Sequence, residues 1–321
     1  MNINRHKVII SLALLAGGTA SCDIPPVAPE IPTATTVAVA AADGETPHRF
    51  QFDIVLMDEG ARALRTRILA QADRWARIVD GSDLEDIEWG PGTISCGGLE
   101  HDFQQDVLDD VFVMISVRDY VAGPTTGSGV RICGFRESSR LPVFGSIFLD
   151  IEGVPEGHVD DVVLHHLGHM LGFGLSWGEL DLLRNPSWNN EGADTHFTGR
   201  MANAAFVAAG GANYAGRKVP VENYWENGTV DYHWRKAVFG TELMGPRLDQ
   251  HVADPLSAIT IQSLADIGYT VNLTEADRYI VPGASASARA AEAGPNLTGD
   301  VVATPAVFYD RHGRVVRVVR D

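Results

Sequence analysis

The chain carries an unusual run at residues 162–174, which read Val162-Val163-Leu164-His165-His166-Leu167-Gly168-His169-Met170-Leu171-Gly172-Phe173-Gly174. His165 and His169 are spaced i, i+4, so on a helix they share one face, with Cβ atoms about 6 Å apart. Two imidazoles placed in this way can bind one metal ion. The run therefore predicts a helix that carries two metal ligands.

The predicted helix has matching signals at both ends. Asp160 and Asp161 precede the histidines, and acidic side chains stabilise the start of a helix. Gly172 follows His169 and can adopt a positive φ, which turns the chain away after the second ligand.

His166 stands between the two predicted ligands, where the zinc motif H-E-x-x-H carries a glutamate that acts as general base. An imidazole with a pKa near 6.5 can accept a proton at neutral pH, although its shape and reach differ from those of glutamate. Without its neighbours, His166 would be interpreted as an exposed histidine or one lying behind the ligands. The sequence predicts metal binding and leaves catalysis open.

Two later residues extend the pattern: His233 in Asp231-Tyr232-His233-Trp234-Arg235, and Met244 in Thr241-Glu242-Leu243-Met244-Gly245-Pro246. With H-x-x-x-H-x-x-G they resemble the metzincin metalloproteases, whose third histidine normally follows three residues after the glycine. Leu175 occupies that place here. In leishmanolysin-like members a long insertion precedes the third histidine and a Met-turn follows it. The layout here is similar, and the resemblance, closest to bacterial secreted relatives, runs from about Phe50 to Tyr279.

The resemblance implies a ligand set and a fold. His165, His169 and His233 would bind one zinc ion (Zn2+) through neutral imidazole nitrogens, the fourth position being left to water. Met244 would form the hydrophobic floor beneath the metal, and the general base of the family falls on His166. The fold would be α+β. It would have an N-terminal lobe with a mixed, twisted sheet and the zinc helix, a loop-rich C-terminal lobe, and a cleft between them.

The expected organisation follows from composition and from these motifs. It comprises a signal peptide of lipoprotein type at 1–21, a disordered spacer at 22–48, the N-terminal lobe at 49–175, the C-terminal lobe at 176–281, and a flexible tail with a possible hairpin at 282–321.

The N-terminus is typical of an export signal, with basic residues, an apolar run and small residues that end at Cys22. Thr19-Ala20-Ser21-Cys22 resembles a lipobox, in which the cysteine is acylated, although Thr19 stands where leucine is usual. The alternative is simple cleavage and release. We expect a location in the cell envelope or outside the cell, with membrane attachment through the N-terminal lipid alone.

Cys96 and Cys133 remain once Cys22 is set aside as the anchor. In an oxidising compartment two such cysteines are expected to pair, so we predict one disulfide. Two unpaired buried thiols are the alternative.

The composition bounds the class of protein. A chain of 321 residues with 45% hydrophobic residues can bury a sizeable core. Its net charge of −17 argues against a nucleic-acid partner, because phosphate binding needs a surplus of Lys and Arg. We expect a protein or peptide as substrate or ligand.

Hydrophobic periodicity predicts the main elements. Strands are expected at 49–56, 111–117, 145–150 and 269–273, helices at 61–79, around 199–209 and at 258–267, a loop region around 123–129, and a small hairpin at 307–319.

Several other residues are weighed for roles in the site. The carboxylates near enough in sequence to replace the general base are Glu179, Glu222, Glu226 and Glu242. The histidines without ligand spacing, expected at the surface, are His101, His158, His196 and His251.

Three functions are therefore open. The first is a zinc metalloendopeptidase, possible because a general base contributes ~10²–10⁴-fold and its loss leaves the Lewis acid in place. The second is a pseudoprotease, a zinc-binding module that keeps the fold without turnover, and His166 favours it. The third is a structural surface lipoprotein without metal.

Overall fold

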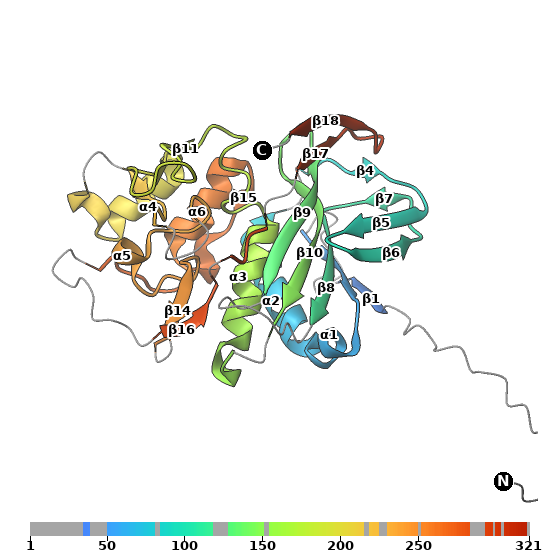
Figure 1. Cartoon of the computed structure of the whole chain (residues 1–321), viewed down its shortest axis with the longest axis horizontal. Coiled ribbons are helices and arrows are strands. Elements are labelled where there is room, and N and C mark those ends of the chain that lie inside the picture. The colour runs from blue at the N-terminus through green and yellow to red at the C-terminus, as the bar shows by residue number, and fades with distance from the viewer. Residues whose placement is uncertain are drawn as a thin grey trace, which may run out of the picture. The chain divides into compact units, whose positions relative to one another are not determined.

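The computed structural model of the chain describes residues 35–38 (backbone only), 50–80, 84–117, 128–150, 154–214, 218–224, 230–249, 252–282, 293–297, 299–302 and 305–319. Ala34–Asp321 forms one compact unit, in which helices are combined with a multi-stranded sheet (Figure 1). This content is compatible with the expected α+β class. The predicted signal peptide and Cys22 lie outside the described residues.

The largest sheet has seven strands within the described ranges. Its order is β1 (Thr35–Ala38), β2 (Phe52–Leu56), β8 (Val111–Val117), β10 (Pro142–Leu149), β9 (Gly129–Arg136), β17 (Ala306–Tyr309) and β18 (Val315–Val319). β8 pairs in parallel with both β2 and β10, whereas β9 runs antiparallel to β10. The expectation of a mixed sheet is therefore confirmed.

Both faces of this sheet are buried, as strand β8 illustrates. Val111, Val113 and Ile115 belong to the main hydrophobic core, while Phe112 and Met114 belong to a second core on the opposite face. Because successive side chains of a strand point to opposite faces, the continuous apolar run of β8 is what a doubly covered strand requires. The main core also contains apolar residues of α2 and α3, and the second contains those of the β5–β6 hairpin.

The helices agree with most of the predicted ranges. They are α1 (Glu59–Ala63), α2 (Arg65–Ile78), α3 (Val159–Met170), α4 (Arg200–Ala208), α5 (Lys236–Phe239) and α6 (Ala258–Ile267), with 3-10 turns at Glu156–His158, Gly211–Asn213 and Leu273–Glu275. The helix expected at 61–79 is divided at Leu64 and starts earlier, because Asp58 caps α1 by accepting from the amide of Ala61. None of the described helices is long and apolar enough to cross a bilayer.

The remaining strands form small sheets. These are β3 (Val79–Asp80) with β15 (Thr270–Val271), β4 (Ile87–Glu88) with β7 (Val107–Leu108), β5 (Gly92–Cys96) with β6 (Leu99–Phe103), β14 (Arg247–Asp249) with β16 (Ala293–Asn296), and β11 (Leu183–Arg184) with β12 (His196–Phe197) and β13 (Val219–Pro220). The expected strand at 269–273 is the short β15.

The predicted disulfide is present. Cys96 at the end of β5 is bonded to Cys133 in the middle of β9. The bond fastens the β5–β6 hairpin to the large sheet, on the face opposite α3.

Strand β9 is a correction to the sequence analysis, which had no strand between those at 111–117 and 145–150. It begins at Gly129, within the region expected as loop, and contains Gly134, against whose α-carbon the ring of Phe144 packs closely. Glycines that look like loop signals are here required by close packing in a strand.

The two ends of the chain also differ from expectation. Thr35–Ala38, expected within a disordered spacer, pairs antiparallel with β2. The segment expected as a flexible tail contributes β16, which pairs with β14, and the hairpin β17–β18, which extends the large sheet beyond β9. The hairpin was predicted, but its place in the central sheet was not. Apolar side chains of the tail, including Leu297 and Phe308, are fully buried in the main core.

The main hydrophobic core crosses residue 175, where the sequence analysis expects a boundary between two lobes. It contains residues from both sides of that position, such as Ile115, Trp177 and Leu264.

Candidate metal centre

Helix α3 positions the first two candidate ligands. Asp160 and Asp161 lie in its first turn, and the helix ends at Met170 before Gly172, whose φ is +98° as expected. Every residue from Val162 to Met170 is buried. A helix that is apolar on all sides belongs in a protein interior, so its histidines meet protein groups rather than solvent.

His165, His169 and His233 converge as predicted. The Nε2 atom of His165 lies 3.0 Å from that of His169 and 3.2 Å from that of His233, and the remaining pair is 3.1 Å apart. All three side chains are fully buried. The i, i+4 spacing brought two of them together, and the fold brings the third.

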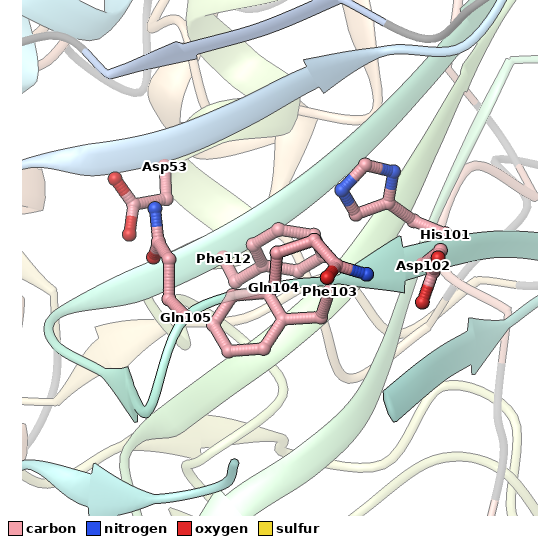
Figure 2. A pocket seen from close by; sticks show the side chains of 7 residues that line it. All are labelled: Asp53, His101, Asp102, Phe103, Gln104, Gln105 and Phe112. Carbon is pink, nitrogen blue, oxygen red and sulfur yellow. The ribbon is translucent and has the colours of Figure 1, made fainter. Parts of the chain in front are cut away.

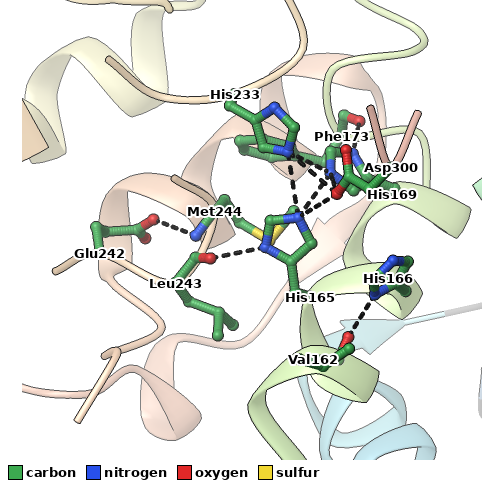
Figure 3. Close-up of polar contacts among 10 residues, drawn as sticks. All are labelled: Val162, His165, His166, His169, Phe173, His233, Glu242, Leu243, Met244 and Asp300. Atoms are coloured by element: carbon green, nitrogen blue, oxygen red, sulfur yellow. Dashed lines mark hydrogen bonds and ion pairs between the residues drawn. The ribbon is translucent and has the colours of Figure 1, made fainter. Parts of the chain in front are cut away.

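Asp300 is a fourth member that the sequence analysis missed. Its Oδ2 lies 2.9 Å from Nε2 of His165, 3.3 Å from that of His233 and 3.6 Å from that of His169 (Figure 3). Its side chain is also fully buried. The sequence analysis left the fourth position of the site to water, whereas the structure places a carboxylate oxygen next to the three imidazole nitrogens.

The orientation of two rings is fixed by backbone carbonyl groups. Nδ1 of His165 lies 2.7 Å from the carbonyl oxygen of Leu243, and Nδ1 of His169 lies 2.9 Å from that of Phe173. A carbonyl oxygen can only accept, so each Nδ1 carries a hydrogen and each neutral ring presents its Nε2 lone pair to the cluster. This is the tautomer that metal-binding histidines use.

Burial sets the charge of the cluster. It lowers the pKa of His165 to about 3 and also lowers the pKa of His169, so both rings are neutral at pH 7. Burial opposes the ionisation of Asp300, but the facing His233 and the hydrogen bonds with the histidines outweigh it, and the pKa of Asp300 lies well below its usual value. At pH 7 the cluster therefore contains the neutral rings of His165 and His169 and the ionised carboxylate of Asp300.

The donor set fits a tetrahedral cation. Zinc bonds of 2.0–2.1 Å to nitrogen and oxygen place neighbouring ligand atoms about 3.3 Å apart in a tetrahedron. The separations found among the three Nε2 atoms and Oδ2 run from 2.9 to 3.6 Å. Lone pairs that converge this closely in a buried space repel one another unless a proton or cation lies between them. These four residues could hold a metal ion.

Met244, the residue of the predicted Met-turn, packs against the helix that carries His165 and His169. Its side chain is fully buried, and a Cβ built on Gly168 would lie 3.1 Å from the Met244 sulfur and 3.1 Å from the ring of Trp75. Gly168, between the two histidines, is what lets the methionine approach. The preceding residue, Leu243, supplies the carbonyl that orients His165.

The third histidine is held through the backbone on either side. The carbonyl of His233 accepts from the amide of Glu222, and the amide of Trp234 donates to the carbonyl of Met244. A Cβ on Gly174 would lie 2.5 Å from the carbonyl oxygen of Tyr232, so the chain that follows α3 presses against the segment carrying His233. Glycine at 174, with φ +77°, permits this approach.

His166 is buried and turned toward its own helix. Its Nδ1 lies 2.6 Å from the carbonyl oxygen of Val162, and its Nε2 has no hydrogen-bond partner among the described residues. No hydrogen bond joins it to the three other histidines or to Asp300 (Figure 3). The expectation that His166 is exposed is therefore wrong. The structure agrees with the alternative, a histidine that lies behind the candidate ligands.

The carboxylates considered as replacement bases have other partners. Glu242 accepts from the amide of Met244, Glu222 accepts from the amides of Asn223 and Tyr224, and Glu179 forms an ion pair with Arg317. Glu226 lies outside the described residues. None of the three described carboxylates contacts the histidine cluster.

Two histidines expected at the surface are buried instead. His158 is 8% exposed and His196 is 7% exposed, because the first lies at the start of α3 and the second in β12. His158 lies near Asp161 and Asp254, a second group of three possible metal ligands. His101 is partly exposed, and His251 lies outside the described residues.

The pocket of about 200 Å³ on the β5–β6 side of the large sheet is unrelated to this centre. It is lined by Asp53, His101, Asp102, Phe103, Gln104, Gln105 and Phe112 (Figure 2). The rings of Phe103 and Phe112 lie between Asp53 and His101 in Figure 2. None of the four clustered residues lines it.

Compared with models of known protein families and with curated proteins, the chain matches none. The interpretation of the centre therefore depends on its own geometry.

Proposed function

We propose that the chain is an exported zinc-binding module of pseudoprotease type, related in layout to leishmanolysin-like metzincins. The observation that carries this proposal is the state of His166. The residue at the position of the general base is buried, and its Nδ1 is bonded to Val162 of the same helix. Its Nε2 could accept a proton, but this atom is buried and no hydrogen bond joins it to the histidine cluster, so it is not placed to take a proton from a substrate or from water at the cluster.

Zinc is the metal we assign to the centre. Three imidazole nitrogens and one carboxylate oxygen, at separations of 2.9 to 3.6 Å, suit its tetrahedral preference. Bound zinc would supply a Lewis acid and a cross-link between segments distant in sequence. The hydrogen bonds that the two α3 rings donate to the carbonyls of Leu243 and Phe173 would keep both histidines in the binding tautomer.

The proposed role is to bind a protein or peptide outside the cytoplasm. The export signal and the candidate lipobox cysteine, Cys22, motivate the location, with the membrane reached only through the lipid. The negative charge of the chain disfavours nucleic acid as a partner.

A zinc metalloendopeptidase is the second candidate. It is favoured by the ring geometry, because the Nε2 atoms of all three histidines meet within 3.2 Å of one another, the arrangement of a catalytic zinc site. Loss of the general base lowers such an activity by ~10²–10⁴-fold without removing the ligands.

Metal analysis and peptide cleavage on the purified full chain test the proposal. We expect about one zinc per chain after reconstitution, and a large loss of zinc in His233→Ala. His312→Ala is the matched control, since His312 lies in the β17–β18 turn and bonds to Glu88. A chain without zinc after reconstitution would refute the proposal.

The His166→Glu variant separates the two candidates. The pseudoprotease proposal expects cleavage of a broad peptide mixture at background in both the wild type and His166→Glu. An increase of ~10²-fold or more in the variant, at unchanged zinc content, would identify an impaired peptidase instead.

A further inference from the structure

We propose that Asp300 is the fourth ligand of the zinc, so that the metal fastens the C-terminal segment around Asp300 (residues 293–297 and 299–302) to α3 and closes the centre to external ligands. This inference depends on the proposed zinc site. It adds a ligand that the three-histidine layout does not contain, from a segment that the sequence suggests is a tail.

A tight turn presents the carboxylate to the cluster. The amide of Asp300 donates to the carbonyl of Leu297 over 3.1 Å, and Gly299 between them has φ +86°. A turn of this kind needs a positive φ at the residue before its end, which glycine adopts without strain. The turn therefore fixes the direction of Asp300 locally, before any metal is considered.

The segment is anchored on both sides of this turn. Upstream, the amide of Leu297 donates to the carbonyl of Pro246 over 3.0 Å, close to Met244 in the Met-turn. Downstream, the amide of Val302 donates to the carbonyl of Val130 over 3.0 Å, and the amide of Val130 donates to the carbonyl of Asp300. The position of the carboxylate is thus set by the Met-turn and by the start of β9.

Close packing supports this placement. Leu297 is fully buried and Val301 is 5% exposed. A Cβ added to Gly129 would lie 3.2 Å from the carbonyl oxygen of Asp300, so glycine at the start of β9 permits the approach. Burial of the segment excludes solvent from the side on which Asp300 faces the histidines.

The lone pairs indicate that a cation belongs between these groups. Two of the three Nε2 atoms that face Oδ2 of Asp300 are on rings whose hydrogen is committed to a carbonyl at Nδ1. A carboxylate oxygen at 2.9 Å from such a nitrogen is unfavourable without a shared proton or cation. A tetrahedral ion bound by all four groups satisfies each of them.

The consequence is a closed centre of the structural kind. Sites with four protein ligands stabilise a fold, whereas catalytic sites keep one position open. Asp300 takes the position that a substrate group would need, and the metal connects α3, the segment with His233, and the C-terminal segment.

Cobalt substitution of the full chain tests the assignment, with Asp300→Cys as the diagnostic variant. A thiolate bound to cobalt(II) gives an intense near-ultraviolet charge-transfer band that oxygen and nitrogen ligands do not give. We expect this band in Asp300→Cys and not in the wild type. Asp310→Cys is the matched control, because Asp310 lies in the same part of the chain and pairs with Arg314.

The outcomes are distinct. A band in Asp300→Cys alone supports the inference, and its absence from an Asp300→Cys chain that binds stoichiometric cobalt overturns it. A wild-type chain that binds no cobalt or zinc refutes the proposed function, and the inference with it.

A second variant covers the case in which the thiolate prevents folding. Asp300→Asn should lower zinc affinity by ~10-fold or more in a chelator competition. Even the replacement of a residue that only hydrogen-bonds to a metal ligand lowers metal affinity by about that factor. It should also allow azide to alter the cobalt spectrum, which we expect to be unchanged by azide in the wild type. Equal azide binding by wild type and Asp300→Asn would overturn the closed-centre inference.

Discussion

Replacement of Glu242 by glutamine should loosen the Met-turn and weaken metal binding. The buried carboxylate of Glu242 accepts from the amide of Met244 at 2.7 Å through Oε2, and through Oε1 from Ser257 at 2.7 Å and from the hydroxyl of Thr260. The Thr260 hydroxyl must donate here, since it accepts from the indole of Trp234. A glutamine has one oxygen for these two groups of donors.

The expected cost follows from that mismatch. With the glutamine oxygen placed toward Ser257 and Thr260, its NH₂ group faces the amide of Met244, and two donors oppose each other. One hydrogen bond to a charged group is lost and one buried amide is left unsatisfied, which together cost about 2 to 4 kcal/mol. For a chain of this size the melting temperature should fall by roughly 5 to 10 °C.

Metal binding should weaken as well, because the Met-turn orients a ligand. The carbonyl of Leu243, adjacent to Glu242, holds Nδ1 of His165 at 2.7 Å. Changes to such supporting groups typically cost ~10–100-fold in metal affinity. Thermal unfolding with and without zinc, together with chelator competition, measures both effects.

Asp266→Asn is the matched control. Its carboxylate accepts from the amides of Met201 and Ala202 at the start of α4, away from the metal centre. It should lower stability without changing zinc affinity. If Glu242→Gln leaves both the melting temperature and zinc affinity unchanged, the reasoning is refuted. Burial raises the pKa of Glu242, and the hydrogen bonds from Thr260, Ser257 and Met244 oppose that shift.

Three further predictions concern packing, the disulfide and pH. Gly168→Leu should destabilise the fold by about 1 to 3 kcal/mol in chemical denaturation, because a side chain there collides with Met244, while Gly168→Ala should have a smaller effect. Replacing Cys96 and Cys133 by serine should cost about 4 kcal/mol for a loop of 37 residues, and equal stability of reduced and oxidised wild type would contradict this. Burial raises the folded pKa of Asp110 to about 7 from 3.8, so its stabilising contribution is complete below pH 3.8 and is lost as pH rises through 7. Asp110→Asn should flatten the fall in stability across that window, and an unchanged pH profile would count against the raised pKa.

The fold was predictable where the signal is local. β8 at 111–117 and α6 at 258–267 have the predicted bounds, because an apolar run and helical periodicity specify them without help from the rest of the chain. β9 was not predictable, because Gly129 and Gly134 resemble loop residues until the neighbouring Phe144 is known. The place of the predicted hairpin in the large sheet was not predictable either, because the pairing of β17 with β9 joins parts of the chain far apart in sequence.

The amino-acid sequence by itself predicted two candidate metal ligands and the pairing of the two cysteines. His165 and His169 are one helical turn apart, so any helix through them places both imidazoles on one face. Cys96 and Cys133 are the pair left once the N-terminal cysteine is set aside, and they are bonded. Both inferences depend on covalent spacing or on counting, which do not require a fold.

Only the tertiary structure decided how the centre is completed and whether its base position is usable. Asp300 has no ligand spacing to either histidine of α3, and the backbone hydrogen bonds of its segment with Pro246 and Val130 bring it there. The sequence likewise gives no sign that His166 is turned toward Val162. The physical reason is that the geometry of such a cluster depends on contacts between segments that are distant in sequence. Burial of the whole hydrophobic core determines these contacts, and local periodicity in the sequence carries no information about them.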